Sequence, residues 1–304
     1  MVAVLHPSCL NLRALSSTRR VVASISAWFC VPEQGMKDME ILSRGSCFLL
    51  PRQDKDFKHS FHVLTASHIV SPWRWPKFYP DEWLQHLNEK HTHYTLELRH
   101  ADGSFITQSE LVPTTYHHDS RDVAVLHLED EAEAMETLEA LGLAALELTD
   151  GPPDEGARLM FHGHEVLGRV TEEADERKPL PRSVVGALQM RLPNQTFAST
   201  ATLLTDGMCG GPVTSAVKSA LGTSVDKAAG ILEGIVGMES PAVDYRGLAV
   251  FLEAQDIAHF ISEVEADVVK GVLCGGEAAQ FVGADQDPDK MDWEKVLQAH
   301  SDKK

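Results

Sequence analysis

A cysteine set between glycines, directly before a Gly-Pro step, constrains this chain more than any other feature of its sequence. The segment runs Thr205-Asp-Gly-Met-Cys-Gly-Gly-Pro212 and places Cys209 at its centre. Glycine permits backbone conformations and close approaches that other residues exclude, so the segment predicts a tight turn that either presents or buries a thiol. A free thiol has a pKa of about 8.5 and needs a neighbouring base to act as a nucleophile at neutral pH. The role of the turn therefore depends on whether the fold brings a histidine and a carboxylate to it.

Two upstream motifs carry such partners. The first is Phe61-His-Val-Leu-Thr-Ala-Ser-His68, an apolar strand-like run that ends in a Thr-Ala-Ser-His turn. The second is Ser120-Arg-Asp-Val-Ala-Val-Leu126, in which Asp122 opens another apolar strand. Each motif alone also fits a structural role: a satisfied buried histidine, a charge at a strand edge, or a tight turn with a buried thiol. In this order the three motifs together predict a triad of His68, Asp122 and Cys209.

With these ordered motifs, the chain resembles chymotrypsin-like proteases of the trypsin superfamily, especially the intracellular HtrA-type branch. Gly45-Ser-Cys-Phe-Leu49 is similar to the Gly-Ser-Gly-Phe strand that precedes the catalytic histidine in HtrA-type enzymes. The cysteine in a Gly-x-Cys-Gly-Gly setting resembles the picornaviral cysteine proteases. The resemblance covers roughly residues 20–270. It implies an all-β fold of two six-stranded antiparallel β-barrels with a C-terminal helix, and peptide-bond hydrolysis as the activity.

The resemblance also implies a role for each site residue. Cys209 would attack the scissile carbonyl as a thiolate stabilised by His68, His68 would protonate the leaving amine, and Asp122 would orient the imidazole. The backbone N–H groups of Gly207 and Cys209 would form the oxyanion hole, where glycine at position 207 leaves room for the peptide unit to point inward.

Substrate preference follows from the same family geometry. The floor of the pocket for the residue before the cleaved bond would be Leu203, and its wall the strand Gly234-Ile-Val-Gly-Met238, which includes Ile235 and Val236. An apolar floor rejects Lys and Arg because burying a charge without a partner is costly. We expect cleavage after small or medium apolar residues of a polypeptide substrate.

Cysteine usage indicates the compartment. The chain has five cysteines, an odd number, with no paired spacings and no Cys-x-x-Cys motif. Such usage gives no disulfide framework and favours a reducing interior. Extracellular members of the superfamily bridge the cysteine that follows the catalytic histidine, and here that position is Ile69. We therefore expect an intracellular protein.

The N-terminal segment favours a mitochondrial address over a cytoplasmic one. Residues 1–32 contain no Asp or Glu, although the chain has 45 acidic and 27 basic residues overall. Arg13, Arg19 and Arg20 lie among serines and leucines, a composition typical of organelle transit peptides. An ordinary short leader before a first strand at Arg20-Val-Val-Ala-Ser-Ile-Ser-Ala-Trp-Phe29 is the alternative.

Charge and spacing exclude several other classes of function. The net charge of −18 argues against nucleic acid or an anionic membrane as a partner. No apolar run reaches 18 residues, so we expect no membrane span. His162 and His164, like the adjacent His117 and His118, lack a third ligand at metal spacing, so we expect no metal and no cofactor. The sequence leaves the oligomeric state open.

Length and composition suit a single catalytic unit. A chain of 304 residues with 43% hydrophobic content holds one two-barrel domain, since all-β barrel domains take roughly 200–250 residues. An Asp-Gly turn at Ala101-Asp-Gly-Ser104, between alternating runs, predicts a hairpin in the first barrel. The predicted boundaries are a leader at 1–20, a protease domain at 21–272 and a mobile charged tail at 273–304 with a short helix around 293–299. Within the domain they are barrel one at about 21–128, an acidic linker at 129–150, barrel two at about 151–252 and a terminal helix at 253–272.

Three segments outside the motifs have predicted roles. Residues 71–90 follow the predicted catalytic histidine and carry five aromatic residues, which either line a substrate groove or cap the first barrel: Trp73, Trp75, Phe78, Tyr79 and Trp83. Residues 129–141 are predicted to form a solvated acidic face with a helical turn or two. Residues 253–269 have apolar positions at helical spacing and are predicted to pack on the second barrel.

Three functions remain open from the sequence. The first is a cysteine-nucleophile endopeptidase that uses His68, Asp122 and Cys209. The second is a non-catalytic binding module with a protease fold, acting within a larger assembly. The third is a thiol-based redox sensor in which Cys209 is oxidised, and it depends on whether the fold supplies a second reactive cysteine such as Cys47.

Overall fold

The computed structural model describes residues 19–52, 60–169, 176–193, 195–218 and 224–274. The predicted leader lies almost wholly outside the described residues, and so does the charged tail with its short helix. The leader and its mitochondrial address therefore stay predictions.

The first half of the chain forms a seven-stranded antiparallel sheet in the order β5-β4-β1-β2-β3-β7-β6. Its strands are β1 (Ala23–Phe29), β2 (Glu40–Pro51), β3 (Phe61–Thr65), β4 (Thr92–Arg99), β5 (Phe105–Leu111), β6 (Tyr116–His117) and β7 (Ala124–Leu126). An antiparallel bridge between Leu111 and Leu128 joins the end of β5 to the segment after β7. The Val112 N–H also donates to the His127 carbonyl at 2.8 Å. The sheet thereby curls towards closure, and the two-residue β6 adds a seventh strand to the six expected.

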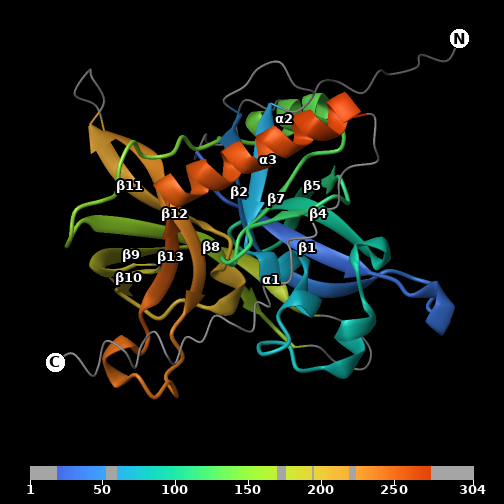
Figure 1. The fold of residues 1–304 in the computed structure, drawn as a ribbon, viewed down its shortest axis with the longest axis horizontal. Helices are drawn as coiled ribbons and strands as arrows, with labels where there is room; N and C mark the ends of the chain where they lie inside the picture. Colours follow the sequence, from blue (N-terminus) through green and yellow to red (C-terminus); the bar gives the residue numbers. More distant parts are fainter. Residues whose placement is uncertain (1–18, 53–59, 170–175, 194, 219–223, 275–304) are drawn as a thin grey trace, which may run out of the picture.

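The second half forms a closed six-stranded antiparallel barrel in the order β10-β13-β12-β11-β8-β9. Its strands are β8 (Arg158–Leu167), β9 (Lys178–Leu192), β10 (Gln195–Thr200), β11 (Pro212–Lys218), β12 (Ser224–Ile235) and β13 (Ala249–Glu253). Figure 1 shows the two sets of strands side by side, with α3 (Ala254–Cys274) following the last strand. The predicted all-β class with two antiparallel units and a C-terminal helix is confirmed.

The predicted Asp-Gly turn joins β4 to β5. Asp102 Oδ1 accepts the Ser104 N–H at 2.9 Å, and Gly103 has a φ of +78°. A side-chain acceptor two residues before the amide and a left-handed glycine are the two features that close such a hairpin.

The C-terminal helix lies across both barrels (Figure 1), whereas the sequence placed it on the second alone. Its apolar stripe is buried at Ile257, Phe260, Ile261 and Val264. The same cluster contains Phe48, Leu64 and Val125 of the first barrel and Ile231 and Leu252 of the second. The helix therefore covers the seam between the barrels, and burial of this shared stripe stabilises their relative placement. Within the described part of the chain, every helix is too short or too polar to cross a lipid bilayer.

The acidic linker contributes to a core as well as to the surface. It contains α2 (Glu131–Ala140), in which Met135 and Leu138 are buried in the core cluster of the first barrel. The acidic side chains occupy other positions of the helix, so it caps the barrel instead of forming only a solvated face.

Most of the aromatic insertion caps the first barrel. Leu84 and Leu87 form a small cluster with Phe29 and Val31, and Trp73 packs against it. The Trp83 ring lies 5.2 Å from that of Phe29, measured between centroids. Tyr79 packs against the same cluster and, as described below, also lies near His68.

Candidate active site

The structure brings His68, Asp122 and Cys209 together between the two barrels. His68 lies in α1 (Ser67–Val70), a single turn after β3. Asp122 lies just before β7, and Cys209 follows a 3-10 turn at Asp206–Met208 that leads into β11. Figure 1 shows α1 at the centre of the molecule, where the two sets of strands meet.

Asp122 binds His68 through both carboxylate oxygens. Oδ1 accepts the His68 backbone N–H at 2.9 Å, and Oδ2 binds the Nδ1 of the imidazole. The imidazole also lies near enough to the Cys209 thiol for the two groups to shift each other's pKa. The carboxylate thus fixes both the backbone and the ring of His68 beside the thiol.

The charges around His68 favour its protonated form. Burial by itself lowers the pKa of His68, but the Asp122 carboxylate and the hydrogen bonds to Asp122 and Cys209 raise that pKa well above 6.5. An imidazole in this setting stays protonated to a higher pH than a free histidine.

The Cys209 side chain is a protonated thiol in this environment. The residue is only 3% exposed. Burial raises the pKa of Cys209 above its ordinary value, and the opposing influence of His68 does not cancel the rise. Thiol activation therefore depends on proton transfer to His68 during the reaction, and a preformed thiolate is not favoured.

The two glycines after Cys209 are required by close packing. Gly210 has a φ of +81°, and a Cβ there would lie 2.3 Å from the Ser46 carbonyl oxygen. A Cβ on Gly211 would lie 1.9 Å from the His162 carbonyl oxygen. Both obstacles are backbone atoms, so the turn has no room for a larger residue.

Gly211→Ala is expected to lower the free energy of unfolding by about 3 kcal/mol or more, since the clash can be relieved only by moving the backbone. Gly234→Ala is the matched control, because a Cβ on Gly234 meets nothing within 4 Å. Urea unfolding of the two variants and the wild type measures the difference. Equal midpoints for all three would contradict the packing described for the turn.

The predicted oxyanion-hole amide of Cys209 is occupied. It donates to the Asp206 carbonyl at 3.0 Å and closes the 3-10 turn. Gly207 fits closely here, since a Cβ on it would lie 2.5 Å from Val166 Cγ2. The Cys209 amide becomes available to a ligand only if the Asp206–Gly207 peptide turns.

Ser46 joins the turn of residues 206–209, called here the Cys209 turn, to the first barrel. Its N–H donates to the Cys209 carbonyl at 3.0 Å, and its Oγ donates to the Gly207 carbonyl at 2.8 Å. The same Oγ accepts the His164 N–H at 2.8 Å. The sequence marked Gly45-Ser-Cys-Phe-Leu49 as a strand motif, but the contacts of Ser46 depend on the tertiary fold.

Tyr79 of the aromatic insertion covers His68. The ring centroids lie 6.1 Å apart with an interplanar angle of 30°. Burial raises the pKa of Tyr79, and its hydroxyl also interacts electrostatically with Cys209 and Asp122. Tyr79 therefore contacts both the capping cluster and His68, and the groove interpretation of this segment stays a prediction.

Glu233 is a site-adjacent residue that sequence reasoning missed. It lies on β12 and is only 5% exposed, and its carboxylate binds Arg121 and the backbone of Asp122. The available signal was a single acidic residue inside the apolar run Ala229-Gly-Ile-Leu-Glu-Gly-Ile-Val236. A buried charge needs a partner, which predicts a contact of this kind.

The predicted substrate-pocket residues differ in burial, since Ile235 and Val236 are half-buried against core clusters and Leu203 is exposed. Leu203 is 56% exposed, so it is not a buried floor. A Cβ on Gly247 would lie 3.1 Å from Leu203 and 3.5 Å from Met238, which places the predicted floor beside the end of the predicted wall. Along the wall, Ile235 pairs with Ala249, and the Val236 N–H donates to the Leu248 carbonyl at 2.9 Å.

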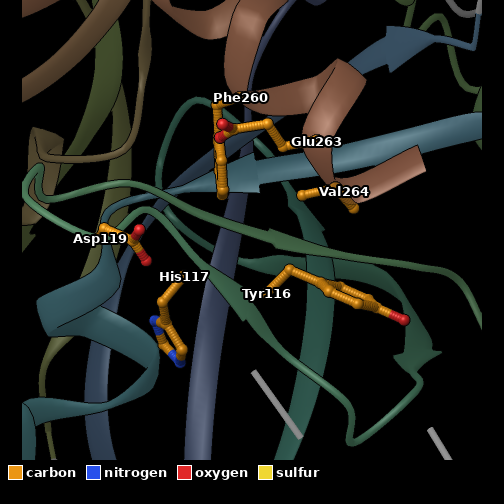
Figure 2. A pocket seen from close by; sticks show the side chains of 6 residues that line it. All are labelled: Tyr116, His117, Asp119, Phe260, Glu263 and Val264. Carbon is orange, nitrogen blue, oxygen red and sulfur yellow. The ribbon is translucent and has the colours of Figure 1, made fainter. Parts of the chain in front are cut away.

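A small hollow lies behind α1, between α3 and the β6 segment (Figure 2). Tyr116, His117 and Asp119 line one side, and Phe260, Glu263 and Val264 of α3 line the other. None of these six residues belongs to the predicted triad or substrate pocket.

His117, at one side of this hollow, supports the turn that carries His68. Its ring nitrogens bind Ser67 Oγ at 2.8 Å and Ser71 Oγ at 3.2 Å. Burial, with a smaller influence of Arg74, lowers the pKa of His117 to about 3, so the ring stays neutral. A neutral histidine with hydroxyl partners on both nitrogens is a structural support for α1.

The two histidines of β8 differ in their contacts. His162 binds Ser183 Oγ at 2.9 Å and Thr214 Oγ1 at 3.0 Å. His164 is buried, and its Nδ1 has no hydrogen-bond partner among the described residues. Among the described residues, no group of three or more His, Cys, Asp or Glu side chains is arranged to hold a metal ion.

Comparison with known proteins gives matches to solved structures only. No family model matches this chain, and no curated protein matches it. Among the solved structures, the active form of the Rv3671c protease from M. tuberculosis is 14% identical, with a TM-score of 0.45, and the match covers 86% of this chain and 93% of that one. The inactive form of the Rv3671c protease is 12% identical, with a TM-score of 0.42, over 79% of this chain and 87% of that one.

Proposed function

We propose that the protein is an endopeptidase that hydrolyses peptide bonds with Cys209 as nucleophile. The observation that carries the proposal is the placement of His68, which is held by Asp122 through the ring and the backbone and lies near enough to the Cys209 thiol to shift its pKa. Three separate chain segments converge to make this arrangement. It meets the requirements for a base-activated nucleophile whose base is oriented by a third group.

The chemistry proceeds in two halves. The imidazole of His68 accepts the thiol proton while Cys209 Sγ bonds to the substrate carbonyl carbon, and the carbonyl electrons move to oxygen. When the intermediate collapses, the C–N bond breaks, the amine leaves with the proton from His68, and a thioester remains. Water, deprotonated by His68, then attacks the thioester, releasing the acid and restoring the thiol.

Stabilisation of the intermediate by backbone amides requires a change of conformation in the Cys209 turn. The Cys209 amide now donates to the Asp206 carbonyl. If the Asp206–Gly207 peptide turns, the amides of Gly207 and Cys209 can both face the developing oxyanion. Each donor of this kind contributes about 3 kcal/mol to lowering the barrier. The hydrogen bond from Ser46 Oγ holds the Gly207 carbonyl in place while the Asp206–Gly207 peptide turns.

We propose cleavage after small or medium apolar residues, supported by the exposed apolar side chains of Leu203 and Met238 beside Gly247. The test is digestion of a diverse peptide library, with cleavage sites identified by mass spectrometry. Cys209→Ala serves as the control for contaminating proteases. Cleavage after Ala, Val or Leu that requires Cys209 supports the proposal, whereas a dominant Arg, Lys or Gln preference refutes the proposed specificity.

A polypeptide-binding module without catalysis is the second candidate. The 3% exposure of Cys209 and the occupied Cys209 amide both favour it, because neither group is free to engage a carbonyl in this conformation. A library peptide that binds without being cleaved, and an unreactive Cys209, would distinguish this function from hydrolysis.

A redox sensor is less well supported. Cys47 is fully buried, and burial together with Glu97 raises its pKa. Such a thiol is a poor resolving partner for an oxidised Cys209, because thiol exchange requires the thiolate and access.

A further inference from the structure

A buried charged pair connects the second barrel to Asp122. The Arg121 guanidinium binds both carboxylate oxygens of Glu233, with Nε 2.9 Å from Oε1. The Asp122 N–H donates to Glu233 Oε1 at 3.2 Å. The Arg121 and Glu233 side chains are 10% and 3% exposed, so the pair is shielded from solvent.

We propose that Glu233, held by Arg121, is a positioning residue that sets Asp122 for its contact with His68. The expected effect on kcat rests on the proposed peptidase function. The expected effect on the Asp122–His68 hydrogen bonds does not depend on it.

The geometry around Asp122 carries this proposal. The Asp122 backbone N–H points to Glu233 of barrel two, and the Asp122 carboxylate points to His68 of barrel one. The aspartate is therefore held from both barrels, and a shift of either would change the Asp122–His68 hydrogen bonds. Glu233 also directly precedes Gly234, the first residue of the predicted pocket wall. A substrate bound along that wall would lie one residue from the anchor of Asp122.

The pair also balances charge near the triad. Burial raises the pKa of Glu233, and the Arg121 cation opposes this rise by favouring the carboxylate. The groups that face His68 are Asp122, the Cys209 thiol and the Tyr79 ring. Glu233→Gln would leave the Arg121 cation without a counter-charge beside Asp122. An uncompensated cation disfavours the imidazolium, so His68 should titrate at a lower pH in this variant.

A double variant separates the effect of Glu233 on the position of Asp122 from the effect of its charge on His68. Arg121→Met combined with Glu233→Met removes both charges and keeps an apolar side chain at each site, which proteins often tolerate without loss of stability. The Asp122 N–H then loses its acceptor while the net charge near His68 stays unchanged. Glu253→Gln is the matched control, because Glu253 binds Arg191 and Thr196 of the same barrel.

The test is an NMR titration of His68 in protein labelled with 15N-histidine, together with kcat and KM for a cleaved peptide. For Glu233→Gln, whose amide oxygen can still accept the Asp122 N–H, we expect His68 to titrate at lower pH, with kcat near that of the wild type above this titration. For the double variant we expect kcat to fall about 10- to 100-fold with little change in KM, as for a misplaced catalytic group. Its His68 Nδ1 proton signal should also change, with the titration near that of the wild type. Glu253→Gln should match the wild type throughout.

A folded double variant with the wild-type His68 Nδ1 signal and kcat, or a folded Glu233→Gln with the wild-type His68 titration, would overturn the proposal, even with the peptidase function intact. If the wild type cleaves no peptide, the His68 titration and Nδ1 signal still decide whether Glu233 positions Asp122. The two failures are therefore distinguishable.

Discussion

Cys209→Ala is expected to lower kcat/KM for peptide hydrolysis by roughly 10⁴- to 10⁶-fold, because the variant retains binding but lacks the nucleophile. His68→Ala should cause a loss of the same order, since the buried thiol is protonated and depends on His68 to accept its proton. The measurement is steady-state cleavage of a peptide selected from the library. Thermal unfolding of each variant checks that the fold is intact.

Cys209→Ala combined with His68→Ala should be little worse than either alone, since the two residues act in one step. Losses that multiply in the double variant would indicate two independent contributions. A Cys209→Ala variant with more than a tenth of wild-type activity would show that another group performs the chemistry.

The peptidase rate is expected to rise with pH through an apparent pKa above 6.5. The sign follows from His68: its protonated form cannot accept the thiol proton, and Asp122 together with Cys209 raises its pKa well above that value. The rising limb belongs to the His68–Cys209 pair as a whole, because the two groups titrate together. The measurement is kcat/KM from pH 5 to pH 10 at constant ionic strength.

Asp122→Asn should move this rising limb to lower pH and lower its plateau by roughly 10²- to 10⁴-fold. Without the Asp122 carboxylate, burial becomes the dominant influence and lowers the pKa of His68. The plateau falls because asparagine does not hold the imidazole in the required orientation and does not stabilise its charge. A limb that stays in place, or moves to higher pH, would contradict the described role of Asp122.

The candidate residues His68, Asp122 and Cys209 could be selected from the sequence because each lies in a local pattern. His68 and Asp122 occur beside apolar strand-like runs, and Cys209 is enclosed by glycines. The β4–β5 hairpin follows from alternation and turn chemistry of the same local kind. In the structure Asp122 binds His68 directly, and His68 lies near the Cys209 thiol.

The supporting contacts could not be predicted because they join residues far apart in the chain. Ser46 reaches Gly207 and Glu233 reaches Asp122 only after the two barrels pack together. Similarly, Tyr79 occurs in a run of aromatics in which most members cap the first barrel, and nothing local distinguishes it. Periodicity identified the apolar stripe of α3 but not its position over both barrels, because a stripe does not specify its partner.

The conformation of the Cys209 turn could not be predicted from the sequence either. Glycine at position 207 permits the Asp206–Gly207 peptide to adopt more than one orientation, and the sequence does not choose between them. In the structure the Cys209 amide binds the Asp206 carbonyl, which is the orientation without an oxyanion hole. A substrate must therefore supply the free energy to turn this peptide if the site is to act as a peptidase.

The most direct test of the central claim is intact-protein mass spectrometry after treatment with an apolar peptide chloromethyl ketone. The wild type, Cys209→Ala and His68→Ala are compared under identical conditions. We predict a single adduct on Cys209 in the wild type, absent from Cys209→Ala and strongly reduced in His68→Ala. A wild-type protein that forms no adduct, with a Cys209 that titrates as an ordinary thiol, would contradict the proposed catalytic site and favour the binding module.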